Sequence, residues 1–356
     1  MVDFEKIKPW IYKLNPEFAH TLTETVLKSY KYCPLFLEWL KKDTFITDLS
    51  LEQHLWGLKF PNPVGVAGGF DKNGTMVESF PLLGFGWGEV GAITPKPQFG
   101  NPKPRVWRFP EWEAVQNSFG FNNQGLERIS NRLKKSYPFK VPIGANIGKN
   151  KTTPPHQAII DYKILVKGLE EVVDFFVVNI SSPNTPGLRT LLNPQFVEKL
   201  IGELSQLTSR PILLKLSPDM EFNTVEQVVA EAIRGGVKGI VLTNTTTDYS
   251  VMPTPIKRGG ISGRPLQQKS FQMLKFVATF LKREELLKQI PLISVGGIDS
   301  PEEGYRRIIH GASLLQLYTP LIFKGPKIVA QINRGIIERL ERDKFKTIGE
   351  AVGANL

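Results

Sequence analysis

The sequence has few of the residues that build disulfides and metal sites. Its 356 residues include one cysteine, Cys33, and four histidines. A single cysteine excludes an intramolecular disulfide framework and any cysteine-rich zinc or iron–sulfur centre, and it fits a reducing compartment. His54, His156 and His310 each stand alone in the sequence. We therefore expect no metal site and no Ser-His-Asp triad.

Long hydrophobic runs are also missing. The opening residues, MVDFEKIKPWIYK, lack the apolar core of about 7–15 residues that a signal peptide contains. No stretch approaches the roughly 18 apolar residues of a membrane-spanning helix. We therefore expect an intracellular protein that contacts a membrane only at its surface.

Acidic residues are outnumbered by basic ones. Forty-five Lys and Arg against 34 Asp and Glu leave a net charge of +11. This excess favours an anionic partner, which could be nucleic acid, a phosphate-bearing cofactor or an acidic lipid surface. Hydrophobic residues make up 41% and charged residues 22%, a composition that excludes a disordered or fibrous chain.

The sequence does contain eight short apolar runs rich in β-branched residues, at 62–69, 85–94, 141–148, 175–181, 211–217, 239–245, 291–298 and 314–320. Near-continuous apolar runs are typical of strands buried on both faces of a parallel sheet. Helical patterns lie between most of them, for example at 193–208, 224–234 and 301–310. This alternation predicts an α/β fold, a (β/α)8 TIM barrel, with a doubly wound open sheet as the alternative.

Two connections between the predicted strands are long, at 95–140 and 246–290. Both leave the carboxyl end of a strand, where a barrel of this kind places its active site. We therefore expect them to supply lid or substrate loops.

The first 45 residues differ from the rest and predict a helical extension at 1–45, ahead of a catalytic barrel at 46–356. Apolar side chains form two helical stripes, at Phe4, Ile7, Ile11 and Leu14 and then at Phe18, Leu22 and Val26. A third apolar segment lies at 35–40, and lysines separate the three. The extension could be a cap over the bottom of the barrel, or an amphipathic segment that lies on a membrane and admits a hydrophobic ligand.

Two segments match known motifs, but the residues around them exclude the corresponding functions. The segment from Gly86 to Gly91 fits G-x-G-x-x-G, but a strand running into prolines follows it rather than a helix, so no dinucleotide fingerprint is present. Glu17 and His20 have the spacing of a di-iron helix motif, yet the chain has no second copy.

The strongest functional signal is the segment Asn179-Ile-Ser-Ser-Pro-Asn-Thr-Pro-Gly-Leu-Arg189, which follows a predicted buried strand. A proline-stiffened polar turn is the ordinary interpretation. Other predicted strands, however, also end in polar or glycine residues, namely Lys72, Asn146, Lys215, Thr243, Asn244, Gly296, Gly297, Tyr318 and Thr319. Because the carboxyl ends of parallel strands meet at one rim, we expect these side chains to converge on one site.

The residue types indicate the ligands of that site. Amides at 117, 179, 184 and 244 match the alternating C=O and N–H edge of a pyrimidine or a flavin. Lys72 and Lys215 suit a carboxylate or the anion of a reduced flavin. Gly263, with the Gly296–Gly297 pair and the helix start at Pro301, is typical of a barrel phosphate site. FMN fits this pattern, and NAD does not.

On these residues the chain resembles the dihydroorotate dehydrogenases, specifically their membrane-associated, quinone-reducing class 2. The resemblance covers nearly the whole chain. It includes the segments LNPEFAH at 14–20, AGGFDKNG at 67–74, EVGAITPKPQ at 89–98, NSFGFN at 117–122, NIGKN at 146–150, NISSPNT at 179–185, SGRP at 262–265, VGGI at 295–298 and FKGP at 323–326.

The resemblance implies oxidation of (S)-dihydroorotate to orotate in pyrimidine (UMP) biosynthesis, with electrons passing through one FMN per chain to a quinone. It implies that Ser182 is the base for the C5 proton while hydride leaves C6 for flavin N5. The implied substrate-binding residues are Lys72, Asn117, Ser118, Phe119, Gly120, Phe121, Asn179, Asn184, Asn244 and Thr245. The implied cofactor-binding residues are Ala67, Gly68, Gly69, Phe70, Lys72, Ala92, Asn146, Asn179, Lys215, Thr243, Gly263, Gly297, Tyr318 and Thr319. His20, Arg108 and Tyr318 resemble quinone-tunnel residues.

Two positions depart from the family pattern. Gly68 stands where alanine is common, and Ala92 stands where many members have serine or threonine, so a side-chain hydrogen bond to the flavin is lost there. Class 1 members use cysteine as the base, but Cys33 lies in the extension and far from every barrel motif, which argues against class 1.

Two other functions remain as alternatives. A flavin barrel acting on RNA, of the dihydrouridine synthase kind, would need a catalytic cysteine in the barrel and a basic appendage, and the sequence has neither. A non-enzymatic membrane-binding module would be centred on 1–45. Under the class 2 resemblance we expect a monomer without nucleic acid, peripheral on the cytoplasmic side of the cell inner membrane.

Overall fold

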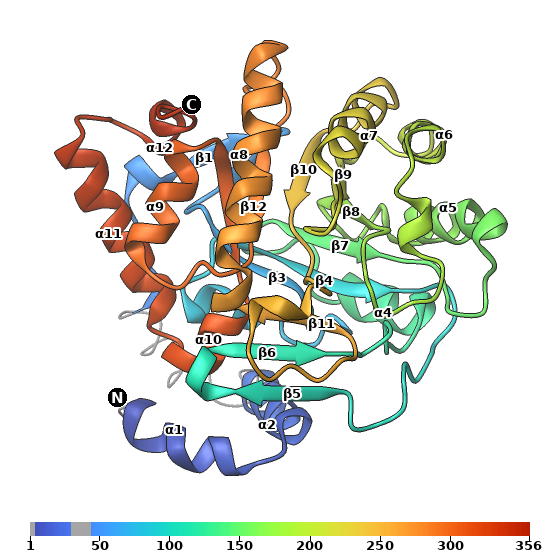
Figure 1. Ribbon diagram of the computed structural model, residues 1–356, viewed down its shortest axis with the longest axis horizontal. Coiled ribbons are helices and arrows are strands. Elements are labelled where there is room, and N and C mark those ends of the chain that lie inside the picture. Colours follow the sequence, from blue (N-terminus) through green and yellow to red (C-terminus); the bar gives the residue numbers. More distant parts are fainter. Residues whose placement is uncertain (1–3, 30–43) are drawn as a thin grey trace.

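Eight parallel strands close into a barrel in the computed structural model, which describes residues 4–29 and 44–356. The strand order around the barrel is β10-β12-β13-β3-β4-β7-β8-β9, and helices surround it (Figure 1). The barrel strands are β3 (Val64–Asp71), β4 (Trp87–Ile93), β7 (Ile143–Ile147), β8 (Phe175–Asn179), β9 (Ile212–Lys215), β10 (Gly239–Leu242), β12 (Leu292–Val295) and β13 (Ala312–Leu317). Each coincides with a predicted run. The predicted TIM barrel is confirmed, and the open-sheet alternative is wrong.

The helices begin where the sequence supplies caps. The side chain of Asn193 accepts a hydrogen bond from the backbone N–H of Phe196, and Ser300 does the same for Glu303, which satisfies amides that the first turn leaves free. The helices are α1 (Phe4–Lys13), α2 (Pro16–Lys28), α4 (Leu126–Lys134), α5 (Ala158–Leu169), α6 (Pro194–Ser205), α7 (Phe222–Arg234), α8 (Gln267–Arg283), α9 (Pro301–Ile309), α10 (Thr319–Lys324), α11 (Ile328–Arg342) and α12 (Ile348–Ala351).

A β-hairpin closes the bottom of the barrel. Its strands β1 (Gln53–Leu55) and β2 (Leu58–Phe60) precede β3. Phe60 packs with Trp87 and Phe175 in a buried cluster at the amino-terminal ends of the barrel strands. Trp56, in the hairpin turn, contacts the rings of Phe60 and Phe175. The barrel interior below the carboxyl ends is therefore a packed core.

The two long connections meet above the opposite end of the barrel. The first contains β5 (Val106–Phe109) and β6 (Ala114–Asn117), and the second contains β11 (Gly260–Gly263). β6 lies between β5 and β11 and pairs with both in antiparallel fashion. Because β6 is hydrogen-bonded on both sides, the two connections form one small sheet (Figure 1).

The N-terminal helices α1 and α2 lie beside this small sheet (Figure 1). Glu17 on α2 forms an ion pair with Arg105, 2.7 Å between Oε1 and Nη2, just before β5. The hydroxyl of Thr75, which follows β3, donates to Glu24 on α2 at 2.8 Å. The interpretation of these helices as a cap over the barrel bottom is therefore wrong, because they pack at the carboxyl-terminal end.

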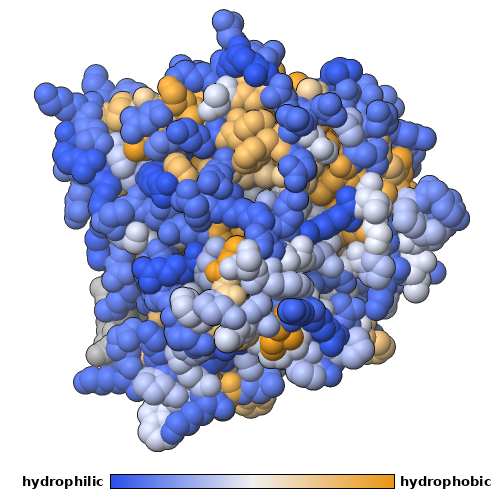
Figure 2. Space-filling view, viewed as in Figure 1, coloured by the Kyte–Doolittle hydropathy of each residue, from blue (hydrophilic) through white to orange (hydrophobic). Residues whose placement is uncertain are grey.

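Several apolar side chains of α1 and α2 are exposed, namely Ile7, Trp10, Phe18, Leu22 and Val26. The predicted third segment at 35–40 and Cys33 lie outside the described residues, and the division at residue 45 stays a prediction. The face of the molecule in Figure 2 is mainly hydrophilic, with scattered hydrophobic groups. Within the two described ranges, no helix combines the length and the hydrophobicity needed to span a membrane.

Candidate active site

The carboxyl ends of the barrel strands open into one cavity below the small sheet. It holds about 1100 Å³ of empty space, counted out to its solvent-open mouth. All eight barrel strands, or the residues that directly follow them, contribute to its lining. The predicted convergence of strand ends on one site is present in the structure.

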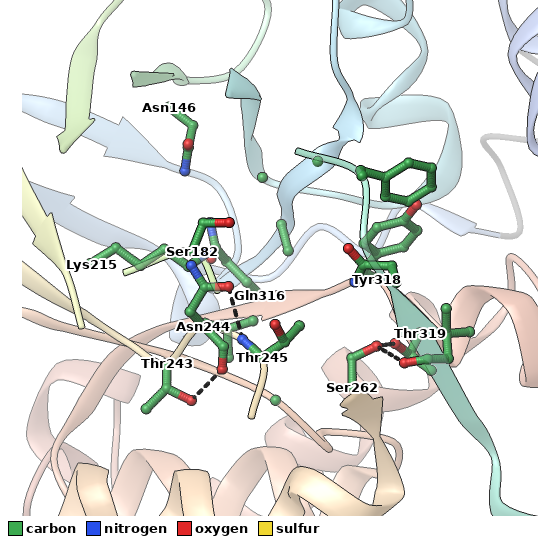
Figure 3. Close-up of a pocket in the computed structure, with 18 of the residues that line it drawn as sticks. Asn146, Ser182, Lys215, Thr243, Asn244, Thr245, Ser262, Gln316, Tyr318 and Thr319 are labelled. Carbon is green, nitrogen blue, oxygen red and sulfur yellow. Dashed lines mark hydrogen bonds between the residues drawn. The ribbon is translucent and has the colours of Figure 1, made fainter. Parts of the chain in front are cut away.

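Most of the predicted site residues line this cavity. They are Ala67, Gly68, Gly69, Lys72, Ala92, Asn117, Phe119, Gly120, Phe121, Asn146, Asn179, Ser182, Asn184, Lys215, Thr243, Asn244, Thr245, Gly263, Gly297, Tyr318 and Thr319. Figure 3 shows Ser182, Lys215, Asn244 and Gln316 grouped on one side of the cavity, with Ser262 and Thr319 on the other.

Ser118 and Phe70 do not line the cavity as predicted. The amide of Asn101 donates to the carbonyl of Ser118 at 3.1 Å and also contacts its hydroxyl, on the outer side of the loop. Phe70 contacts the rings of His20 and Tyr318 instead. Ser118 is therefore placed to hold the loop, and Phe70 is placed between the cavity and the N-terminal helices.

Ser182 lies on the loop after β8 and is buried, with 5% of its surface exposed. Its hydroxyl oxygen accepts a hydrogen bond from the backbone N–H of Asn184 at 3.3 Å. The amide of Asn184 donates to Asn117 Oδ1 at 3.1 Å, which joins this loop to β6. Within the described residues, the buried Oδ1 of Asn184 and Oγ1 of Thr185 have no hydrogen-bond partner, so both oxygens can serve a ligand or a bridging water.

Arg189 holds the Ser182 loop in place, a role that the sequence reasoning missed. Its guanidinium donates to the carbonyls of Ser181 and Thr245, each at 3.0 Å, and to Asp219 Oδ2 at 2.9 Å. Burial raises the pKa of the Asp219 carboxyl, but hydrogen bonds from Thr246, Thr247 and Lys269 outweigh it and hold that pKa at about 2. An ionised Asp219 therefore anchors Arg189 across the working pH range.

Lys72 is a half-buried cation at the edge of the cavity. Its ammonium donates to the carbonyl of Gly69 at 2.8 Å and lies 4.4 Å from the centroid of the Phe119 ring. Burial lowers the pKa of Lys72 to about 8, with the charges of Glu17 and Glu24 opposing the shift. At neutral pH the side chain is mostly charged, which suits an anionic ligand group.

Lys215 is 5% exposed at the end of β9. Within residues 4–29 and 44–356 it has no hydrogen-bond or ion-pair partner, although its side chain lines the cavity. A buried cation without a partner is costly, so the site is built to receive a ligand that carries negative charge or strong acceptors. The buried amides of Asn146 and Asn179 also line the cavity, as does the half-buried amide of Asn244.

Glycines make close backbone approach possible on the far side. A Cβ on Gly297, where φ is +73°, would lie 2.5 Å from the Cα of Gln267, and one on Gly263, where φ is +93°, would lie 2.2 Å from the carbonyl of Glu113. Only glycine fits these positions. Ser262 and Thr319 add hydroxyls, 3.0 Å apart. Gly296 and Gly297 line the cavity, whereas the predicted helix start at Pro301 does not.

His20 reaches this end of the barrel from α2. Its ring packs edge-on against Phe70, with centroids 5.6 Å apart, and lies 6.5 Å from the ring of Tyr318. Burial, helped by the charge of Lys72, lowers the pKa of His20 to about 4, so the ring is neutral at pH 7. Arg108, predicted for the same group, is directed to α1, where it donates to the carbonyl of Ile11 at 3.2 Å.

The cavity includes polar residues that the sequence prediction did not select, namely Asn122, Ser262 and Gln316. Gln316 had a usable signal, because it is a single polar residue within the apolar strand Leu-Leu-Gln-Leu. The same signal marked Lys215. Arg189 and Asp219 had none, since their role depends on contacts between separate loops.

Comparisons with known proteins agree with this geometry. Residues 50–340 match the family model for dihydroorotate dehydrogenase. The chain belongs to the dihydroorotate dehydrogenase family. Members of the family are flavin-dependent.

The relatives match over full length. A dihydroorotate dehydrogenase (quinone) from Nautilia profundicola is 57% identical, over 99% of this chain and 97% of the relative. One of the same name from Sulfurimonas denitrificans is 48% identical, over 100% and 99%. Among solved structures, DHODH from Eimeria tenella in complex with ferulenol superposes with a TM-score of 0.82 at 29% identity, covering 100% of this chain and 99% of that one.

Proposed function

We propose that the protein oxidises (S)-dihydroorotate to orotate and passes the electrons, through FMN, to a quinone. The observation that carries this proposal is that Ser182, Lys72 and Lys215, from three different strand ends, line one cavity. A hydroxyl base, a cation for a carboxylate and a cation for an electron-rich ring are the groups that this reaction needs. The names of the full-length relatives support the choice of substrate and acceptor.

FMN fits the residues present. The unpartnered Lys215, the amides of Asn146 and Asn179, and the backbone at Gly68–Gly69 suit the isoalloxazine ring. The Gly263 and Gly297 turns, with the Ser262 and Thr319 hydroxyls, suit the phosphate. Ala92 offers no side-chain hydrogen bond. FMN bound here would supply a hydride acceptor for C6 of dihydroorotate and a two-electron donor for the quinone.

Ser182 takes the C5 proton in this proposal. A serine hydroxyl is a very weak acid, so its oxygen needs a route by which its own proton leaves. We assign this route to the hydroxyl of Thr185, which lies on the same loop and has no hydrogen-bond partner among the described residues, with a water bridging the two oxygens. Arg189 fixes the carbonyls of Ser181 and Thr245, so the loop presents Ser182 to the substrate at low entropic cost.

Lys72 binds the substrate carboxylate, and this gives a pH dependence. Because burial lowers the pKa of the free side chain to about 8, the ammonium is present below pH 8 and is lost as the pH rises through that value. Affinity for orotate should therefore be level near pH 6–7 and fall above pH 8, by up to about tenfold per pH unit. Titration of flavin absorbance with orotate from pH 6 to 10 measures this.

A Lys72→Met variant is the control for that titration. It should bind orotate weakly, and its affinity should not begin to fall near pH 8. An orotate affinity that stays constant between pH 7 and 9.5 in the parent enzyme would contradict the assignment of Lys72.

The quinone approaches between the N-terminal helices and the barrel in this proposal. His20, Phe70 and Tyr318 form an aromatic contact between α2 and the cavity. The exposed apolar side chains of α1 and α2, with lysines between them, suit attachment to a lipid surface. We place the protein on the cytoplasmic side of the inner membrane, as a monomer.

Replacing His20 with alanine should raise the KM for quinone about threefold to tenfold, because the ring is part of the wall along which the acceptor enters. Reduction of a soluble dye by dihydroorotate should stay within twofold of the parent rate. His54→Ala, an exposed histidine on β1, is the control and should leave both rates unchanged. Equal losses in the quinone and dye assays would show that His20 serves the fold and not acceptor access.

One experiment tests the proposed function as a whole. The purified protein should show an oxidised flavin spectrum with FMN released on denaturation, and anaerobic dihydroorotate should bleach it. Added quinone should restore the oxidised spectrum. A flavin that stays oxidised with dihydroorotate would refute the substrate, and one that quinone fails to reoxidise would refute the acceptor.

A further inference from the structure

A buried carboxylate lies below the cavity and has no part in the mechanism above. It belongs to Glu89 on β4, whose residue is fully buried. Its Oε2 accepts a hydrogen bond from Asn146 Nδ2 at 2.9 Å, and its Oε1 accepts one from Gln316 Nε2. Two cavity-lining amides, from β7 and β13, therefore donate to one carboxylate.

The hydrogen bonds continue from Asn146 toward the Ser182 loop. Asn146 Oδ1 accepts from Asn179 Nδ2 at 3.0 Å, and Asn179 Oδ1 accepts from Asn244 Nδ2 at 3.2 Å. Asn244 Nδ2 also donates to the hydroxyl of Ser181 at 3.1 Å. Each amide in this series donates toward Glu89. In a low-dielectric interior such chains polarise one another.

The donor-to-acceptor direction of these hydrogen bonds depends on Glu89, the residue at which the series ends. A side-chain amide can present either its oxygen or its NH2 to a neighbour. A carboxylate only accepts, so both Asn146 and Gln316 must turn their NH2 groups to Glu89. With its NH2 turned to Glu89, Asn146 presents its oxygen on the other side of the amide, where it accepts from Asn179, and Asn179 presents its oxygen to Asn244 in the same way. Gln316 keeps a buried Oε1 with no partner among the described residues, in a residue that lines the cavity.

We propose that Glu89 is a positioning residue that sets the donor and acceptor orientation of the Gln316, Asn146, Asn179 and Asn244 amides, and so fixes the hydrogen-bonding pattern that the cavity offers to its two ring ligands. This rests on the proposed function, in which Asn146 and Asn179 hold FMN, and on the family resemblance, which implies that Asn179 and Asn244 bind the substrate. Glu89 touches neither ligand and acts through the amides.

The glycine at position 68 is consistent with this role. A Cβ on Gly68 would lie 2.6 Å from Glu89 Oε2 and 2.8 Å from Asn146 Nδ2. Both distances are too short for a carbon atom beside the pair. Gly68 therefore leaves the room that the Glu89–Asn146 hydrogen bond occupies.

The test is Glu89→Gln in the full-length, FMN-loaded enzyme. Glutamine has the same shape, but it brings an NH2 of its own, which must face the NH2 of Gln316 or of Asn146. The amide series then turns or loses a bond. We expect the dissociation constant for orotate, measured from the change in flavin absorbance, to rise roughly tenfold to a hundredfold. Asp174→Asn is the matched control, because that carboxylate accepts from the backbone N–H of Ile143 at the bottom of the barrel. It should change orotate affinity less than twofold.

A double variant separates orientation from loss of structure. Gln316→Leu removes the NH2 that conflicts with the introduced glutamine, so Glu89→Gln should weaken orotate binding much less in the Gln316→Leu background than in the parent. Additive effects of the two substitutions, or an unchanged orotate affinity in Glu89→Gln, would overturn the proposal.

Glu89→Asp covers the case in which Glu89→Gln does not fold. It keeps the acceptor-only head group but shortens the side chain, so that one carboxylate cannot reach both Asn146 and Gln316, and it should weaken orotate binding at least threefold; unchanged affinity would overturn the proposal. The parent enzyme distinguishes the two levels of inference. If it does not bind orotate at all, the proposed function fails, whereas normal orotate binding in parent and variants alike refutes only the role of Glu89.

Discussion

Replacing Ser182 with alanine should lower the rate of dihydroorotate oxidation by about 10²- to 10⁴-fold, the usual contribution of a positioned base. The hydroxyl is buried in the cavity, and Arg189 holds its loop through two backbone carbonyls. The substitution removes the oxygen that takes the C5 proton and leaves these contacts in place. Anaerobic stopped-flow measurement of flavin bleaching by dihydroorotate gives the rate directly.

The variant should still bind FMN and should bind orotate within about threefold of the parent enzyme. Ser130→Ala is a suitable control, because that hydroxyl donates to the carbonyl of Gly168 on the outside of the barrel and should not affect bleaching. A bleaching rate within tenfold of the parent would remove Ser182 from its role.

Lys215→Met should have the second large effect. The ammonium has no partner among the described residues. Under the proposed function a bound flavin would be its counterpart, and a fixed cation favours the reduced, more negatively charged state. A charge-assisted hydrogen bond contributes about 1.5–3 kcal/mol. Losing it should lower the two-electron potential of the flavin by about 30–60 mV, and oxidation of dihydroorotate should slow at least about tenfold.

Spectroelectrochemical titration of the holoenzyme measures this potential, and the flavin content of the purified variant reports on cofactor affinity. Lys163→Met is the control. This lysine lies on α5 and pairs with Glu203 at the surface, where such pairs contribute little. A Lys215→Met enzyme with full flavin content and an unchanged potential would show that Lys215 does not contact the flavin.

The fold could be predicted from the sequence because strands buried on both faces leave a simple signal. Eight apolar runs mark the eight barrel strands, and the polar residue after each run marks the rim. Lys215 could be selected because an unpaired lysine in the apolar run Ile-Leu-Leu-Lys is costly unless a ligand meets it. These are local signals, and the structure places them as expected.

Contacts between distant segments could not be predicted in the same way. The pairing of β6 with β11 joins residues about 145 positions apart. Neither strand has a sequence pattern that indicates which strand it pairs with. The bottom of the barrel is closed by the hairpin around Trp56. The helices α1 and α2 therefore do not cover the bottom and pack at the opposite end. Ser118 lies in the predicted loop, but its carbonyl and hydroxyl contact the amide of Asn101 and not the cavity. The direction of this side chain depends on the backbone conformation of the loop, which the sequence does not indicate.

The pairing of β5 and β6 connects the cavity to the N-terminal helices. Residues 119–121, which cover the cavity, follow directly from β6, and α2 is held against the approach to β5 by the Arg105–Glu17 ion pair. The residues that line the cavity and the ion pair that holds α2 therefore lie together at the open end of one hairpin. At that open end the backbone N–H of Ser118 donates to the carbonyl of Arg105 at 2.8 Å, so the segment that lines the cavity and the segment that holds α2 are joined by a direct hydrogen bond.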